Sequence, residues 1–166
     1  MGAKNGRWWL TEDRAEVVVA APADQIYDMV AELTRMGEWS PECERVEWLD
    51  GASGPVAGAT FVGHNRGGPR KLLKWSRRGR VLTADRGREF AFATEEGGYE
   101  GTVWRYRFEA VGDATRVTES YEVRKIPVWA RIVDVPTNRY RELQESMRHT
   151  LDRLKAAAEA RVIPGA

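Results

Sequence analysis

The last part of the chain carries its longest uninterrupted hydrophobic pattern. Residues 138–160 contain neither Gly nor Pro and are mostly strong helix formers. Apolar residues recur there at steps of three and four, which places them on one face of a helix. The stripe consists of Tyr140, Leu143, Met147, Leu151, Leu154 and Ala158. This helix would span roughly 34 Å at 1.5 Å per residue. A stripe of that length needs a large apolar partner surface.

Most of the preceding chain alternates between apolar and polar residues with the two-residue period of β-strands. The clearest alternation is in 102–111, where Trp104, Tyr106 and Phe108 share one face. Glycine and proline separate these segments, and Gly112-Asp113 is typical of a two-residue hairpin turn. The pattern predicts seven strands, at residues 15–21, 43–49, 59–65, 72–83, 89–94, 102–111 and 115–123.

Between the first two strands the pattern predicts a broken helical segment. Pro22 suits the first turn of a helix, and Ile26, Met29, Val30 and Leu33 follow at helical spacing. Gly37 is expected to cap its end. Residues 126–133 are compatible with a short helix and with a covering loop. This order of elements indicates an α+β fold, in which a strongly bent antiparallel sheet of about seven strands wraps around the C-terminal helix.

The chain shows no repeat, low-complexity tract or linker, so we expect one domain. Its predicted parts are an N-terminal arm at 1–14, the domain at 15–161 and a tail at 162–166. No apolar run approaches the roughly 18 residues of a membrane span. The N-terminus also lacks the apolar core of a signal peptide. We therefore expect a cytoplasmic protein without stable membrane insertion, as a monomer or homodimer.

The composition includes an unusual number of aromatic residues and few Cys and His residues of the kind that bind metals. Seven Trp, five Tyr and four Phe are many for 166 residues, which favours a deep core or an apolar pocket. The single cysteine, Cys43, excludes an internal disulfide and a multi-cysteine metal site. The glycines of 63–68 lack the Gly-Lys-Ser/Thr ending of a phosphate loop. No metal, nucleotide or other cofactor is expected.

Positive charge is concentrated in the middle of the chain. Residues 51–84 contain seven Arg and Lys residues and no Asp or Glu, although the whole chain has a net charge of only +1. A solvated sheet edge is the first interpretation, because Lys and Arg protect edge strands. An anionic head group or a membrane surface near a cavity mouth is the second. Nucleic acid is the third, since no recognised binding motif accompanies the charge.

Several segments resemble those of a known superfamily. They are VAAPADQIYDMV at 19–30, RMGEWSP at 35–41, GATFVGHNR at 58–66, WRY at 104–106, TRVTES at 115–120 and SMRHTLDRL at 146–154. With the order of elements, they are similar to the START-like, birch-pollen-allergen-like (SRPBCC) superfamily, and within it to the bacterial polyketide cyclase/dehydrase and lipid-transport group. The resemblance implies a helix-grip fold with an elongated cavity between sheet and helix that takes a hydrophobic ligand.

Rings and a few polar groups are the candidate ligand contacts. We predict a site formed by Trp39, His64, Asn65, Trp75, Phe92, Trp104, Tyr106, Glu119, Tyr121, Trp129, Leu143 and Met147. Strand parity allows either His64 or Asn65 to face inward, but not both. If Glu119 faces inward, it needs a partner such as an arginine, because an isolated buried charge is very costly. A bulge that turns it to solvent is the alternative.

These features favour binding of a hydrophobic or aromatic small molecule, lipid-like or polyketide-like, with transport or sequestration as possible purposes. The alternative is a cyclase/aromatase-type enzyme, for which His64, Tyr106 and Tyr121 are the acid/base candidates. A second alternative is an interaction or stress-response module without turnover. In each case the expected partner is a small apolar ligand, and nucleic acid is not expected.

Overall fold

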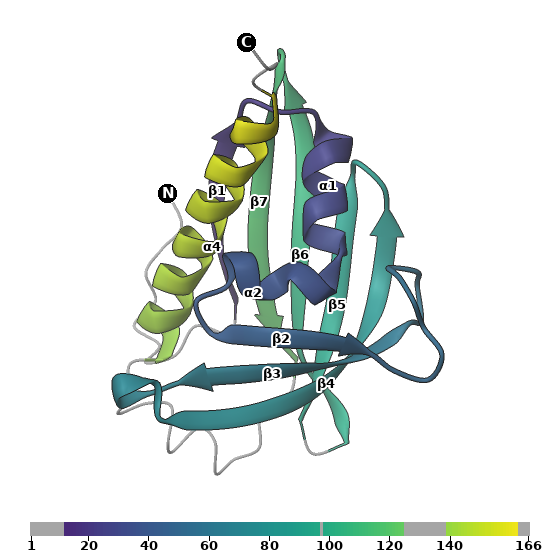
Figure 1. The fold of residues 1–166 in the computed structure, drawn as a ribbon, viewed down its shortest axis with the longest axis vertical. Coiled ribbons are helices and arrows are strands. Elements are labelled where there is room, and N and C mark those ends of the chain that lie inside the picture. Colours follow the sequence, from purple (N-terminus) through teal and green to yellow (C-terminus); the bar gives the residue numbers. More distant parts are fainter. Residues whose placement is uncertain (1–11, 97, 125–138, 163–166) are drawn as a thin grey trace.

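A seven-stranded antiparallel sheet curls around one long helix (Figure 1). The computed structural model describes residues 12–96, 98–124 and 139–162. The strands are β1 (Glu12–Val19), β2 (Cys43–Trp48), β3 (Thr60–Gly67), β4 (Leu73–Asp85), β5 (Glu89–Glu96), β6 (Tyr99–Val111) and β7 (Ala114–Val123). The helices are α1 (Ala23–Ala31), α2 (Met36–Trp39) and α4 (Arg139–Val162), with 3-10 turns η1 (Leu33–Arg35) and η2 (Pro69–Lys71). The predicted α+β helix-grip class is confirmed.

The sheet has the order β1-β7-β6-β5-β4-β3-β2, so the first strand closes against the last one. In Figure 1, β2, β3 and β4 run across the direction of β1, β7 and β6, which shows how strongly the sheet bends. The register of β4 against β5 shifts between Val81 and Thr83, and such an irregularity increases local bending. Gly79 leaves the space that the ring of Phe61 occupies. The sheet thus forms a concave face.

The concave face is covered by helices, with α4 packed chiefly along β1 (Figure 1). The predicted stripe of α4 is buried at Met147, Leu151, Leu154 and Ala158, and half-buried at Leu143. The side chain of Tyr140 lies outside the described part. Burying one such aliphatic side chain contributes about 1.5–3 kcal/mol relative to leaving it exposed. The C-terminal half of α4 therefore anchors the helix to the sheet.

The broken helical segment differs from the prediction at its end. Gly37 lies inside α2 and does not cap a helix. A Cβ at this position would lie 2.5 Å from the carbonyl oxygen of Glu44. The glycine is thus explained by the close approach of α2 to β2, a tertiary contact that helix-capping rules do not consider.

Smaller differences concern the ends of elements. β1 begins at Glu12, because three residues assigned to the N-terminal arm pair with Ser120, Tyr121 and Glu122 of β7. Val162, the first residue of the predicted tail, still belongs to α4. The ambiguous segment 126–133 lies outside the described residues. Within the residues that the structure does describe, no helix is both long and apolar enough to cross a membrane.

Candidate functional site

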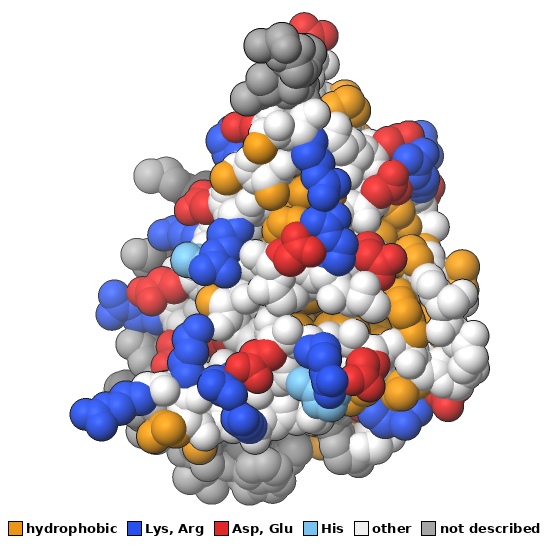
Figure 2. Space-filling model, in the orientation of Figure 1, with side chains coloured by type: hydrophobic (Ala, Val, Ile, Leu, Met, Phe, Trp, Pro, Cys, Tyr) orange, Lys and Arg blue, Asp and Glu red, His pale blue; other side chains and the backbone are white. Residues whose placement is uncertain are grey.

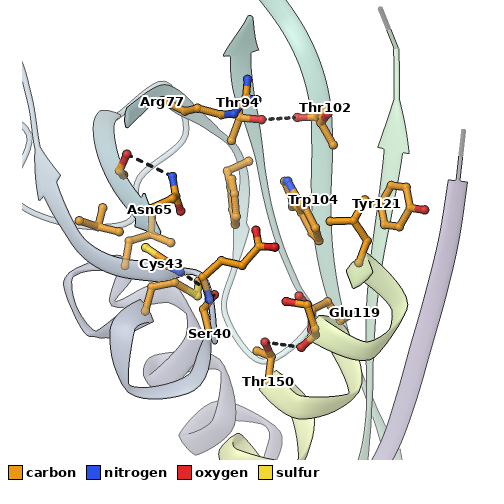
Figure 3. Close-up of a pocket in the computed structure, with 18 of the residues that line it drawn as sticks. Ser40, Cys43, Asn65, Arg77, Thr94, Thr102, Trp104, Glu119, Tyr121 and Thr150 are labelled. Atoms are coloured by element: carbon orange, nitrogen blue, oxygen red, sulfur yellow. Dashed lines mark hydrogen bonds between the residues drawn. The ribbon is translucent and has the colours of Figure 1, made fainter. Parts of the chain in front are cut away.

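A cavity of about 260 Å³ lies between the concave face of the sheet and the helices (Figure 3). Its sheet wall is mostly aromatic, because neighbouring strands present rings at paired positions. Phe92 of β5 is opposite Trp104 of β6, which is opposite Tyr121 of β7. The ring centroids of Trp104 and Tyr121 are 5.5 Å apart, a distance typical of attractive ring pairs. The remaining rings of this wall are Phe61, Trp75 and Tyr106.

The opposite wall comes from the helical segments and β2. It is apolar at Leu33, Met36, Val46 and Leu143. Helix α4 adds Ser146 and Thr150, and the hydroxyl of Thr150 donates to the carbonyl oxygen of Ser146 at 2.9 Å. Leu143 is the apolar part of the α4 wall, and the hydroxyl of Thr150 is already bonded to its own helix.

Polar side chains lie on several sides of the cavity, and Ser40, Cys43 and Asn65 are on the side of β2 and β3 (Figure 3). Arg77, Thr94 and Thr102 lie together on one side of the view, and the hydroxyl of Thr94 donates to the carbonyl oxygen of Thr102 at 3.4 Å. Glu119 and Thr150 lie on the other side. The arginine is half-exposed, whereas the glutamate is buried. The cavity thus has a half-exposed basic end at Arg77 and a buried end at Glu119, with rings between them.

The buried end contains a carboxyl–phenol pair. Tyr106 Oη donates to Glu119 Oε1 at 2.8 Å, and these residues are only 2% and 4% exposed. Among the described residues, Glu119 Oε2 has no hydrogen-bond partner. Burial raises the pKa of Glu119 to about 8, and the hydrogen bond from Tyr106 offsets only part of this effect. The carboxyl group is therefore neutral at pH 7. The pKa of Tyr106 is raised as well, first by burial and then by Glu119.

Cys43 is the only thiol of the chain and also lines the cavity. Burial raises its pKa to about 11, so the thiol remains protonated at neutral pH. A protonated thiol is a poor nucleophile. No group of three or more His, Cys, Asp or Glu side chains is arranged to hold a metal ion in the parts of the chain that the structure covers.

Eight of the predicted site residues line this cavity. They are Asn65, Trp75, Phe92, Trp104, Tyr106, Glu119, Tyr121 and Leu143. Trp39 and Met147 are buried in the core and do not line it. Trp129 lies outside the described residues. That these side chains contact a ligand remains a prediction.

His64 is on the opposite face of β3 from the cavity. Its Nδ1 is 2.8 Å from Ser76 Oγ, and its Nε2 is 4.0 Å from Glu47 Oε1. Side chains alternate along a strand, so the inward position of Asn65 places His64 outside. This resolves the open question of parity in favour of Asn65. His64 therefore does not line the cavity that contains Tyr106 and Tyr121.

The partner of Glu119 also differs from the expected arginine. It is Tyr106, which is directly opposite Glu119 in the β6–β7 register. The two-residue turn at Gly112-Asp113 fixes the register of β6 against β7. Counting back from this turn along both strands pairs Tyr106 with Glu119.

Several lining residues were missed by the sequence analysis. Arg77, Thr94 and Thr102 each lie two positions from a predicted inward ring, so strand parity could have identified them. Thr150 lies seven residues after Leu143, on the same face of α4. Ser40, Glu42 and Cys43 come from the irregular corner before β2 and its first residue, where neither period applies.

Comparisons with known proteins agree with this architecture. The fold and its internal cavity place the chain in the START-like class of helix-grip proteins. The sequence model of the family described as polyketide cyclase / dehydrase and lipid transport matches residues 12–159, and the chain belongs to this family. No curated protein has a significant sequence match to the chain.

Solved structures share the fold over almost the whole chain. The Polyketide_cyc-like protein Cgl2372 from Corynebacterium glutamicum is 29% identical, with a TM-score of 0.60 over 92% of this chain and 94% of that one. A START superfamily protein from Mycobacterium smegmatis is 17% identical, with a TM-score of 0.67 over 91% and 99%. The di-domain ARO/CYC StfQ of the steffimycin biosynthetic pathway is 18% identical, with a TM-score of 0.63 over 90% of this chain and 45% of that one.

The raised pKa of Glu119 predicts a specific dependence of stability on pH. The folded protein keeps the proton up to about pH 8, whereas an unfolded chain releases it near pH 4.3. Between these values the folded state binds more protons, so rising pH lowers the free energy of unfolding, by up to about 1.4 kcal/mol per pH unit. Urea denaturation from pH 5 to 8 should show this decline relative to Glu119→Gln. Parallel curves for the two proteins would contradict the assignment.

Proposed function

We propose that the protein binds a hydrophobic or aromatic small molecule in the cavity between the sheet and α4. The observation that carries this proposal is the aromatic wall, in which Phe61, Trp75, Phe92, Trp104, Tyr106 and Tyr121 surround unfilled space. An apolar cavity with a few convergent polar groups is the usual form of a ligand site.

The size of the cavity limits the ligand. A dry apolar cavity of about 150 Å³ binds benzene in an engineered protein. The present cavity, at about 260 Å³, is suited to a molecule larger than benzene, such as two fused rings with a substituent. Membership in a family described by polyketide and lipid chemistry supports the same ligand class. Transport or sequestration of such a ligand requires no further chemical group.

Catalysis of the cyclase/aromatase type is a second candidate, favoured by the buried pair of Glu119 and Tyr106. A neutral carboxyl group in an apolar cavity is suited to general acid catalysis. Glu119 would donate its proton to a ketone oxygen while an enol carbon of the same substrate attacks that carbonyl. The enol hydroxyl would then return a proton to the carboxylate. The ARO/CYC protein StfQ has the same fold, which supports this candidate by analogy only.

Gly63 offers a direct test of binding in the cavity. It lines the cavity from β3, and a Cβ placed there would have no neighbour closer than 3.9 Å. Leucine at this position would therefore extend into the ligand space. With the neutral fluorescent probe N-phenyl-1-naphthylamine, we expect saturable binding to the natural protein. Gly63→Leu should weaken it about tenfold or more, because overpacking of this kind costs about 1–3 kcal/mol.

The control for this experiment is Gly54→Leu. Gly54 lies in the loop before β3, and a Cβ there meets nothing within 4 Å. Its variant should bind the probe like the natural protein. Urea denaturation would show that both variants are folded. Absence of probe binding to the natural protein, or equal affinity in a folded Gly63→Leu protein, would overturn the proposal.

A further inference from the structure

The unpartnered oxygen of Glu119 limits the chemistry of the ligand. Tyr106 donates to Oε1, so the proton of the neutral carboxyl group is carried by Oε2. That oxygen is buried and lacks a hydrogen-bond partner within the described parts of the chain. A buried donor without an acceptor is unfavourable, and a ligand that supplies one removes this cost.

The surroundings of the carboxyl group favour a neutral acceptor over a cation. The other titratable groups lining the cavity are Tyr106, Tyr121, Cys43, Glu42 and Arg77, and the lining residues of α2 and α4 add none. An ammonium group bonded to Glu119 would require the ionised carboxylate, which burial disfavours. A ketone or related carbonyl only accepts a hydrogen bond. It therefore matches the protonated carboxyl group.

The basic end of the cavity is a weaker site for the same carbonyl. Arg77 is half-exposed, so water can solvate its guanidinium group before any ligand binds. Glu119 is 4% exposed and gains its partner only from the ligand. Because a hydrogen bond gives more selectivity where water is excluded, the buried end should orient the ligand.

We infer that the ligand carries a carbonyl oxygen, which accepts a hydrogen bond from Glu119 Oε2 at the buried end of the cavity. This inference rests on the proposed function, because it assumes that an apolar ligand occupies the cavity. It adds the class of ligand, an apolar or aromatic ketone, and assigns Glu119 and Tyr106 as the pair that recognises it.

Three ligands of nearly equal shape test the inference. They are 2-acetylnaphthalene, 2-ethylnaphthalene and 1-(2-naphthyl)ethylamine, each measured by displacement of N-phenyl-1-naphthylamine. Replacing Glu119→Leu together with Tyr106→Phe removes both polar partners, a change that tends to preserve stability. We expect the affinity ratio of ketone to hydrocarbon to fall about tenfold in this double variant. Glu119→Gln keeps a donor, so its ratio should stay within about twofold of that of the natural protein.

The pH dependence separates the acid from the amide. Ketone affinity of the natural protein should fall as pH rises above about 8, where Glu119 ionises, and should stay constant in Glu119→Gln. An unchanged ketone-to-hydrocarbon ratio in the double variant would overturn the inference while leaving the proposed function intact. Preferential binding of the amine, lost in Glu119→Gln, would also overturn it. If none of the three ligands binds, the proposed function itself fails.

A second inference arises independently from the turn between β3 and β4. Leu72 and Leu73 are 75% and 61% exposed there. Three basic residues, Arg70, Lys71 and Lys74, are exposed beside them. Figure 2 shows basic side chains around apolar ones at the lower left of the molecule, where this turn lies. We call residues 70–74 the hairpin tip.

The charges of the hairpin tip differ from those farther along the same strands. Arg66, Arg78 and Arg80 form ion pairs with Glu44, Asp50 and Glu100, respectively.

None of the three basic residues at the tip has an ion pair with any described residue. Lys71 Nζ instead donates to the carbonyl oxygen of Pro41 at 3.2 Å. The tip thus combines positive charge that no described carboxylate pairs with and exposed leucines.

The position of the tip links it to the cavity. Trp75, which lines the cavity, follows the tip directly in β4, and its ring packs against Gly67 at the end of β3. This ring is half-buried, so only part of it is open to stacking on nucleic-acid bases. Exposed leucines have no function in binding a phosphate backbone, whereas they can enter the head-group region of a bilayer.

We propose that the hairpin tip docks on a bilayer that contains anionic phospholipid. Its cations are attracted to the negative surface, and Leu72 and Leu73 insert at the boundary between head groups and acyl chains. Docking would place the Trp75 side of the cavity near the membrane, the source of apolar molecules. Two weak attractions of different kinds suit a reversible contact.

Vesicle co-sedimentation of the full chain tests this docking. We expect binding to phosphatidylcholine vesicles that contain one quarter phosphatidylglycerol, a decrease with added salt, and little binding to pure phosphatidylcholine. Arg70→Gln/Lys74→Gln should weaken binding about 10- to 30-fold, since each cation near such a surface contributes about 1 kcal/mol. Arg78→Gln/Arg80→Gln removes the same charge from paired positions and should have a much smaller effect.

A second pair of variants tests the contribution of the exposed leucines. Leu72→Ser should weaken binding, whereas Val56→Ser, which changes another exposed apolar residue, should not. Equal binding to neutral and anionic vesicles, or equal effects of the two double variants, would overturn the proposal. Two further outcomes would also overturn it. One is dimerisation that Leu72→Ser abolishes, and the other is oligonucleotide binding through the tip without vesicle binding.

Discussion

The geometry of the fold depends on a difference in width: the concave face of the bent sheet is broader than the apolar stripe of the single long helix that packs on it. Helix α4 buries its stripe against β1 from Met147 to Ala158, and α1 and α2 cover the neighbouring part of the concave face. Strands β2 to β4 then turn across the rest of the sheet. One helix stripe is too narrow to fill the volume that such a sheet encloses. The unfilled part is the cavity, and its aromatic wall consists of side chains that the helix does not reach.

The same arrangement of sheet and helix also determines which polar groups of the cavity are buried. Glu119 and Tyr106 are on adjacent strands and are both buried, so desolvation determines the protonation of the carboxyl group. Arg77, on the more open side, keeps its contact with solvent. A single bent sheet therefore produces one buried end that can donate a hydrogen bond and one half-exposed basic end. A ligand that spans both is oriented by the difference between them.

The pattern of apolar and polar residues predicted the fold, because helices and strands each have a characteristic period. The stripe of α4 and the alternation in β6 were sufficient to infer a helix held by a curved sheet. Eight candidate residues line the cavity because they share strand or helix faces with the rings. What escaped prediction depended on tertiary contact, as with Gly37 against Glu44, or on cross-strand register, as with Tyr106 opposite Glu119. The alternation along β3 does not by itself show which face points inward, so both His64 and Asn65 were candidates.

The central claim is that Glu119, protonated in an apolar cavity, recognises a carbonyl group. A crystal structure of the protein with 2-acetylnaphthalene tests this most directly. The naphthalene rings should lie against the aromatic wall, and the carbonyl oxygen should lie within about 3 Å of Glu119 Oε2, the distance of a hydrogen bond. A ligand bound outside the cavity, or one whose carbonyl oxygen points to Arg77 and leaves Glu119 without contact, would contradict it.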